Sequence, residues 1–267
     1  MTNLYDAALQ CLLERDADRK IQLTHDFATR WRAGELSLDG AESGVERLEY
    51  PGRPDTPELV DPAKVPRRGM RNLAERMALI HSLAHIEFNA VNLGWDAVYR
   101  FRDLPKRYYD DWVQVADDEA KHFIALRQRL RDNGSDYGQF QAHNGLWEMA
   151  LKTDTDFTAR MALVPRVLEA RSLDVVPRIN QKLASVGDHE TVAVLEMIER
   201  EEVAHVAAGS RWFEYSCEQL GLEPRSTFRQ LVEQFMGVRL KGPFNREAHN
   251  RAGFSFDELD ELETWGA

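Results

Sequence analysis

The sequence of 267 residues contains only two cysteines, Cys11 and Cys217. This scarcity excludes a disulfide framework and a cysteine-rich zinc site, and it favours a reducing compartment. Uncharged apolar runs also stay well short of the roughly 20 residues that a membrane helix needs. The first 30 residues lack the basic and apolar regions of a secretory signal. We therefore expect a cytoplasmic protein that has no membrane partner.

Positive charge is in deficit, with 34 Lys and Arg against 45 Asp and Glu and a net charge of −11. Such a balance argues against nucleic-acid binding through global charge, although a local basic patch remains compatible with it. Two basic clusters are present, and we interpret both as solvated helix faces. They are Arg67, Arg68 and Arg71, and Arg127, Arg129 and Arg131.

No stretch shows the sustained alternation of a strand, so we predict an all-α protein. Apolar residues recur at helical spacing in an N-terminal segment and in four long stretches, and STFRQLVEQFM predicts one short helix more. The four long helices are expected over about 70–101, from Pro105 to Asn133, from Asp156 onward with a kink at Pro165, and from Asp188 to Gly221. Their lengths and short connections are typical of a four-helix bundle.

Five of the ten prolines fall within residues 51–66, which cannot form a helix and are expected to run extended over the surface. This loop separates an N-terminal helical arm from the bundle. We therefore expect an arm and proline-rich loop over 1–69, a bundle over 70–221, and a tail over 222–267 that packs on the bundle. The tail segment KGPFNREAHNRAGF is predicted to be irregular.

Two Glu-x-x-His motifs lie on predicted helices, Glu119 with His122 and Glu202 with His205. Residues three apart share a helix face, so each motif can direct a carboxylate and an imidazole at one point. These ligands suit divalent iron or manganese. Glu201 competes with Glu202, because it lies four residues before His205 and shares that face too.

The register of two further glutamates strengthens the metal interpretation. Glu87 precedes Glu119 by 32 residues and Glu169 precedes Glu202 by 33, so a Glu followed by Glu-x-x-His occurs twice. This repeat predicts two similar helical hairpins packed as a pseudo-symmetric bundle. Four buried carboxylates would be costly without partners, and two divalent cations would compensate their charge in full.

The sequence resembles the ferritin-like superfamily and, within it, a bacterial family of unknown function. The resemblance runs from about Met70 to Phe254 and is carried by AHIEFNAVNLGWDAVYRF, DDEAKHF, LEARSLDVVP, EEVAHVAAGSRWF and KGPFNREAHNRAGF. It is more distantly similar to the tRNA-isopentenyladenosine hydroxylases, which are also di-iron bundles. The resemblance implies a ferritin-like four-helix bundle with two Fe or two Mn ions. Its ligands would be Glu87, Glu119, His122, Glu169, Glu202 and His205, with Glu119 and Glu202 as the bridging pair.

By this resemblance we expect a non-haem di-iron or di-manganese oxidoreductase, an oxygen-dependent hydroxylase or oxygenase of unknown substrate. Its partners would be molecular oxygen, an electron donor and a substrate, with a modified nucleoside in tRNA as a candidate. A monomer or small homo-oligomer is expected. Two alternatives stay open, an iron-binding or iron-oxidising protein without organic substrate and a metal-free helical scaffold.

Four further residues are candidates for supporting the metal ligands. Asp118 could hydrogen-bond a ligand histidine, or belong to a solvated acidic turn. His85 is turned about 200° from Glu87 around its helix, so it is expected to pack or to support a ligand. Arg166 could balance the carboxylates, bind an anionic substrate group or lie on the surface. Glu199 lies one turn before Glu202 and could face the site or the solvent.

Overall fold

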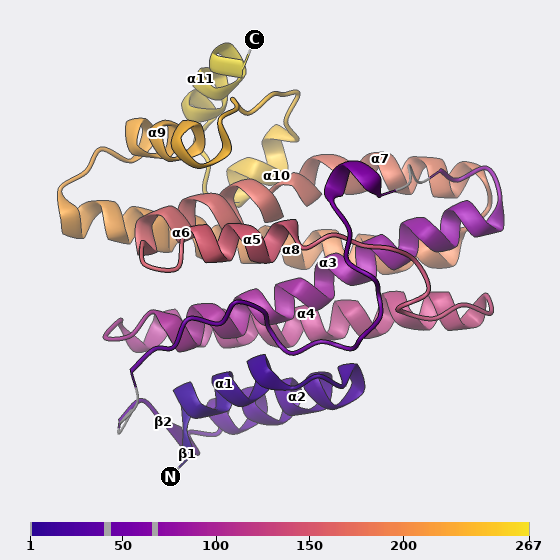
Figure 1. Ribbon diagram of the computed structural model, residues 1–267. Coiled ribbons are helices and arrows are strands. Elements are labelled where there is room, and N and C mark those ends of the chain that lie inside the picture. Colours follow the sequence, from indigo (N-terminus) through magenta and orange to yellow (C-terminus); the bar gives the residue numbers. More distant parts are fainter. Residues whose placement is uncertain (1, 40–43, 66–68, 267) are drawn as a thin grey trace. The chain divides into compact units, whose positions relative to one another are not determined.

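The structure is a computed structural model that describes residues 2–39, 44–65 and 69–266. Its regular structure is almost entirely helical, which confirms the all-α prediction. The contacts divide the chain into two compact units, Met1–Glu148 and Met149–Ala267 (Figure 1). Each unit is described by itself. The division falls inside residues 70–221, so the four-helix bundle and the expected domain boundaries stay predictions.

A long antiparallel hairpin, α3 (Leu73–Arg100) and α4 (Lys106–Asp132), forms the centre of the first unit (Figure 1). The side chain of Asn72 caps α3 by accepting from the Glu75 amide, and α4 follows Pro105 directly. These bounds confirm the first two predicted helices. A Cβ on Gly94 would lie 2.9 Å from the Cβ of Ala116, so this glycine lets the two helices approach closely.

The N-terminal arm consists of two helices, α1 (Leu4–Leu13) and α2 (Ala17–Arg32), which pack on α3 and α4 respectively (Figure 1). Two short parallel strands join the arm's ends, β1 (Thr2–Asn3) and β2 (Leu36–Ser37). The expectation of no strand was wrong here, because two residues are too few to show an alternating pattern.

The proline-rich stretch runs without α-helix over its described residues 51–65, apart from a 3₁₀ turn at Pro62–Lys64. Pro66, Arg67 and Arg68 lie outside the described residues. A helix that the sequence analysis missed, α5 (Gly145–Lys152), crosses the division between the units. The amide of Gly145 donates to Nδ1 of His143 at its start, which is a local capping contact.

In the second unit the third predicted helix is broken into three parts: α6 (Phe157–Leu163), a π-helical turn (Val164–Glu169) and α7 (Arg171–Ser185). Pro165 causes the break, because its ring and its missing N–H disfavour a regular turn. The Ala170 amide donates to the Pro165 carbonyl five residues back, which is the π pattern. All three parts pack along α8 (His189–Leu220), which ends at Gly221 in the left-handed conformation.

The tail contains more helix than predicted. The helix α9 (Pro224–Met236) was expected, but α10 (Arg246–Arg251) and α11 (Phe256–Gly266) were not, and α10 lies inside the segment predicted to be irregular. Asn245 caps α10 and the Ser255 hydroxyl caps α11, and these contacts stabilise helices of only two or three turns. Of the helices described, none has the length and apolar content to cross a membrane.

Candidate metal centre

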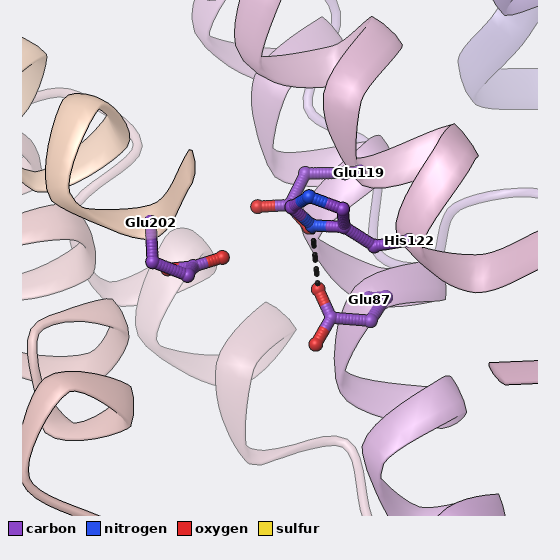
Figure 2. Close-up of side chains that lie close together, drawn as sticks. All are labelled: Glu87, Glu119, His122 and Glu202. Carbon is purple, nitrogen blue, oxygen red and sulfur yellow. Dashed lines mark hydrogen bonds and ion pairs between the residues drawn. The ribbon is translucent and has the colours of Figure 1, made fainter. Parts of the chain in front are cut away.

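The first unit brings three of the predicted ligands together. Glu87 comes from α3, and Glu119 and His122 come from one face of α4. One ligand atom of each lies within 4.8 Å of the others, and all three side chains are buried. His122 Nδ1 lies 3.2 Å from a carboxylate oxygen of Glu119 and 3.5 Å from one of Glu87 (Figure 2). We call these three residues the first half-site.

Burial and mutual repulsion dominate the electrostatics of the first half-site. Burial raises the pKa of Glu87 well above its ordinary value, and the neighbouring Glu119 carboxylate raises it further. Burial lowers the pKa of His122, but Glu119 and Glu87 outweigh it and raise that pKa to about 11. Without a cation, a proton on the imidazole therefore offsets part of the negative charge.

The second unit carries the matching residues Glu169, Glu202 and His205, which we call the second half-site. All three side chains are buried. A carboxylate oxygen of Glu202 lies 3.5 Å from Nδ1 of His205. His122 directs the same ring nitrogen, Nδ1, at Glu119. Within the described part of this unit, the three ligand atoms do not all fall within 4.8 Å of one another.

Ser172, which the sequence analysis did not foresee, contacts the backbone of Glu169 and the side chain of Glu202 in the second half-site. Its hydroxyl oxygen lies 2.7 Å from the Glu169 carbonyl and 3.3 Å from the Glu202 carboxylate. A serine three residues after Glu169 falls on the same side of a helix as that glutamate, and this spacing was the available signal. Since one hydroxyl has one proton, it can donate to only one of these oxygens at a time.

A glycine seven residues after a candidate ligand glutamate supports each half-site. Gly94 follows Glu87 and permits the close contact with Ala116. Gly209 follows Glu202, and a Cβ there would lie 2.3 Å from the Pro165 ring. The proline thus widens the turn that ends in Glu169 and also fits against the glycine of the helix that carries Glu202. These contacts fix how the ligand-bearing helices approach.

Burial distinguishes Glu202 from Glu201. Glu202 is buried beside His205, whereas Glu201 is partly exposed. The geometry therefore favours Glu202 as the ligand.

His85 lies in a hydrogen-bond network of its own. Its Nδ1 is 2.8 Å from the Tyr137 hydroxyl and its Nε2 is 3.1 Å from the His143 carbonyl oxygen. Burial lowers the pKa of His85 to about 4, so the ring is neutral at physiological pH. Both nitrogens are engaged, which gives His85 a packing role in its unit.

The other supporting candidates lie in different surroundings. Asp118 lies 3.3 Å from Lys121 on its own helix, and Glu199 lines a surface hollow with Glu196. Burial raises the pKa of Glu199, and Glu196 adds to the shift. Roles for these two at the metal site stay predictions.

Arg166 is neither on the surface nor paired with a proposed ligand. Its guanidinium donates to Glu258 at 2.9 Å and to the Ser210 hydroxyl at 3.1 Å. Three phenylalanine rings surround it, with centroids 4.2–5.0 Å from its Cζ: Phe213, Phe228 and Phe254. The charge of Arg166 is thus balanced by a glutamate of α11, whose helix the sequence analysis missed.

The chain is thus an all-α protein with a buried carboxylate and imidazole cluster that could hold a metal ion. It belongs to the family described as "Protein of unknown function (DUF455)", whose model matches residues 13–260. A Haemophilus influenzae protein described as "Uncharacterized protein" is 42% identical over 214 residues, which are 78% of this chain and 74% of that protein. No solved structure matches the chain. The expected membership of an uncharacterised family is confirmed, while the ferritin-like and tRNA hydroxylase resemblances stay predictions.

Proposed function

We propose that the chain is a ferritin-like metalloprotein that holds two iron or manganese ions and acts as an oxygen-dependent oxidoreductase. The observation that carries the proposal is the first half-site, where two carboxylates and an imidazole converge inside the protein. The second half-site repeats the same residue types in the same order. The proposed ligands are the residues of both half-sites, Glu87, Glu119 and His122 together with Glu169, Glu202 and His205.

The residues present fit such ions by chemistry and by charge. Carboxylate oxygen and imidazole nitrogen suit iron(II) and manganese(II), which bind sulfur ligands less readily than softer metals do. The four glutamates of the two half-sites carry four negative charges when ionised, and two divalent cations neutralise them. The raised pKa of Glu87 reflects the cost of leaving that charge uncompensated. A cation would remove the same cost.

Iron held by these residues would supply oxygen activation. The protein's own residues have other tasks. Burial of Glu87, Glu119 and His122 keeps bulk water away from the reacting atoms. The Ser172 hydroxyl can hold a proton beside the Glu202 carboxylate, 3.3 Å away. A hydroxylation or related oxygenation is the proposed reaction, and a modified nucleoside in tRNA is the first substrate class to try.

Metal content per chain tests the proposal directly. The full chain is purified without chelator, incubated anaerobically with iron(II) or manganese(II), desalted and measured by elemental mass spectrometry. Glu87→Gln and Glu202→Gln each remove one proposed ligand with little change in shape. Glu196→Gln is the matched control, because Glu196 is an exposed glutamate on the same helix as Glu202.

We expect close to two ions per chain in the wild type and in the control, and a clear loss in both ligand variants. Retention of two ions by both variants would overturn the ligand assignment. Absence of metal from the wild type would overturn the proposal and favour a metal-free scaffold. If metal binds and oxygen is consumed without any organic product, the iron-oxidising alternative replaces the hydroxylase.

A further inference from the structure

The second unit contains a cavity of about 360 Å³ that the residues of the second half-site do not line. One wall is the face of α7 that carries Arg171, Asp174 and Arg178. The other walls are the chain between Met236 and Phe244, and the helices α10 and α11. Small-molecule sites span about 300–1,000 Å³, so the cavity suits a compact ligand.

Positive charge dominates this cavity in a chain whose net charge is −11. Five cationic side chains line it: Arg166, Arg171, Arg178, Arg239 and Lys241. Three of them, Arg171, Arg178 and Lys241, are exposed and form no ion pair with any described residue. Uncommitted cations at the mouth of a cavity attract an anion and hold it by charge-assisted hydrogen bonds.

Asp174 is the one acidic side chain among the described residues that line the cavity, and it is already engaged. Its Oδ1 accepts from the Asn245 amide at 2.7 Å and lies 3.1 Å from Nε2 of His249. Asp174 therefore anchors the loop before α10, and its charge is shared with groups other than the exposed arginines. The cations at the mouth stay available to a ligand.

His249 adds a buried polar side chain to the lining of the cavity. Its side chain is only 5% exposed and lines the cavity between the rings of Phe244 and Phe254. Because the Asp174 carboxylate can only accept, Nε2 of His249 carries a hydrogen. The other nitrogen, Nδ1, is buried without a hydrogen-bond partner among the described residues. A buried orphan of this kind is uncommon in a folded protein and calls for a partner.

The remaining walls are apolar and include Val238, Leu240, Leu259 and Leu262. We propose that this cavity binds a small organic anion with an apolar body, whose carboxylate or phosphate group lies against Arg171, Arg178 and Lys241. The proposal does not depend on the metal site, because neither Glu202 nor His205 lines the cavity. The family comparison assigns no ligand to this part of the chain.

Binding to the full chain can be measured by calorimetric titration with four probes. Octanoate and octyl phosphate carry an anionic group on an apolar chain, octanol has the chain alone, and inorganic phosphate has the charge alone. The double variant Arg171→Ala/Arg178→Ala removes two cations of the mouth. Lys182→Ala is the matched control, since Lys182 is an exposed cation one turn beyond Arg178 that does not line the cavity.

We expect one molecule of octanoate or octyl phosphate per chain, bound at least tenfold more tightly than octanol or inorganic phosphate. The tighter of the two identifies the headgroup. The double variant should weaken binding at least tenfold, and the Lys182 variant should leave it unchanged. The proposal is overturned if neither anion binds, if octanol binds equally well, or if the double variant binds as the wild type does.

Discussion

Replacement of Glu87 by glutamine should change the stability of the protein in opposite directions with and without metal. In the metal-free chain the Glu87 carboxylate is buried beside Glu119. Burial raises the pKa of Glu87 most, and the charge of Glu119 raises it further. Glutamine keeps the shape and removes the charge. With metal present, the same change removes a ligand. We therefore expect Glu87→Gln to stabilise the metal-free protein and to abolish most of the stabilisation by metal.

The size of the metal-free effect follows from the geometry. The ligand atoms of the cluster lie within 4.8 Å of one another, and two unit charges at that distance repel by about 3.5 kcal/mol at an effective dielectric constant of 20. The variant also loses the attraction between Glu87 and His122, so the net gain should be about 1–2 kcal/mol. At roughly 2–4 °C per kcal/mol, the melting temperature should rise by a few degrees.

The effect should depend on pH in a defined sense. Because the folded pKa of Glu87 lies above its ordinary 4.5, both states are protonated below that value and the carboxylate costs nothing. Destabilisation grows as the pH rises from 4.5 through the folded pKa, and it is complete above that. The gain from Glu87→Gln should therefore be present at pH 8 and absent at pH 4.

Differential scanning fluorimetry with chelator, and again with iron(II) or manganese(II) under anaerobic conditions, measures both effects. A ligand at 100 times its dissociation constant stabilises the folded state by about 2.7 kcal/mol, and the wild type should gain an amount of this order. The exposed Glu196→Gln variant should behave as the wild type in every condition. A lower melting temperature for Glu87→Gln in chelator would refute the electrostatic reasoning, and an undiminished metal shift would refute the ligand assignment.

Three further changes test other contacts. Burial lowers the pKa of Lys20 to about 7, so wild-type stability should rise between pH 7 and pH 10; Lys20→Met should gain stability near pH 7 and flatten that rise in thermal melts. Gly209→Ala would place a Cβ 2.3 Å from the Pro165 ring, and denaturant titration should show a loss of about 1–3 kcal/mol. Arg166→Met would leave the buried Glu258 carboxylate without its cation and should cost about 3–5 kcal/mol, whereas combining it with Glu258→Gln should recover part of that loss.

Local signals account for the parts of the fold that the sequence predicted. The helix α8 begins after a capping aspartate, Asp188, and ends at Gly221, whose φ of +66° suits glycine. Pro165 predicted the break in the third helix, because the proline ring and the missing N–H disfavour a regular helical turn. The missed helix α11 also had a signal, since Ser255 followed three residues later by Glu258 has the sequence pattern of a capping box, and the Ser255 hydroxyl does accept from the Glu258 amide.

In the candidate site, too, some residues could be predicted from local spacing and others could not. Spacing selected Glu87, Glu119 and His122, which the structure brings together, because residues three or four apart share a helix face and the hairpin sets the rest. The partner of Arg166 could not be found by spacing, since Glu258 lies 92 residues further along the chain and belongs to another helix. Local periodicity specifies which face a residue occupies, whereas only tertiary packing specifies what it meets there.

The order in which the ligands are synthesised follows from the placement of one half-site in each unit. Glu87, Glu119 and His122 all belong to Met1–Glu148, so a ribosome delivers the whole first half-site before it has translated Glu169. N-terminal units generally fold first during synthesis. Between His122 and His205 the ribosome adds 205 − 122 = 83 residues, and until Glu169 is added the nascent protein carries three of the six candidate ligands. Under the proposed function, an ion bound in that interval would contact the first half-site alone.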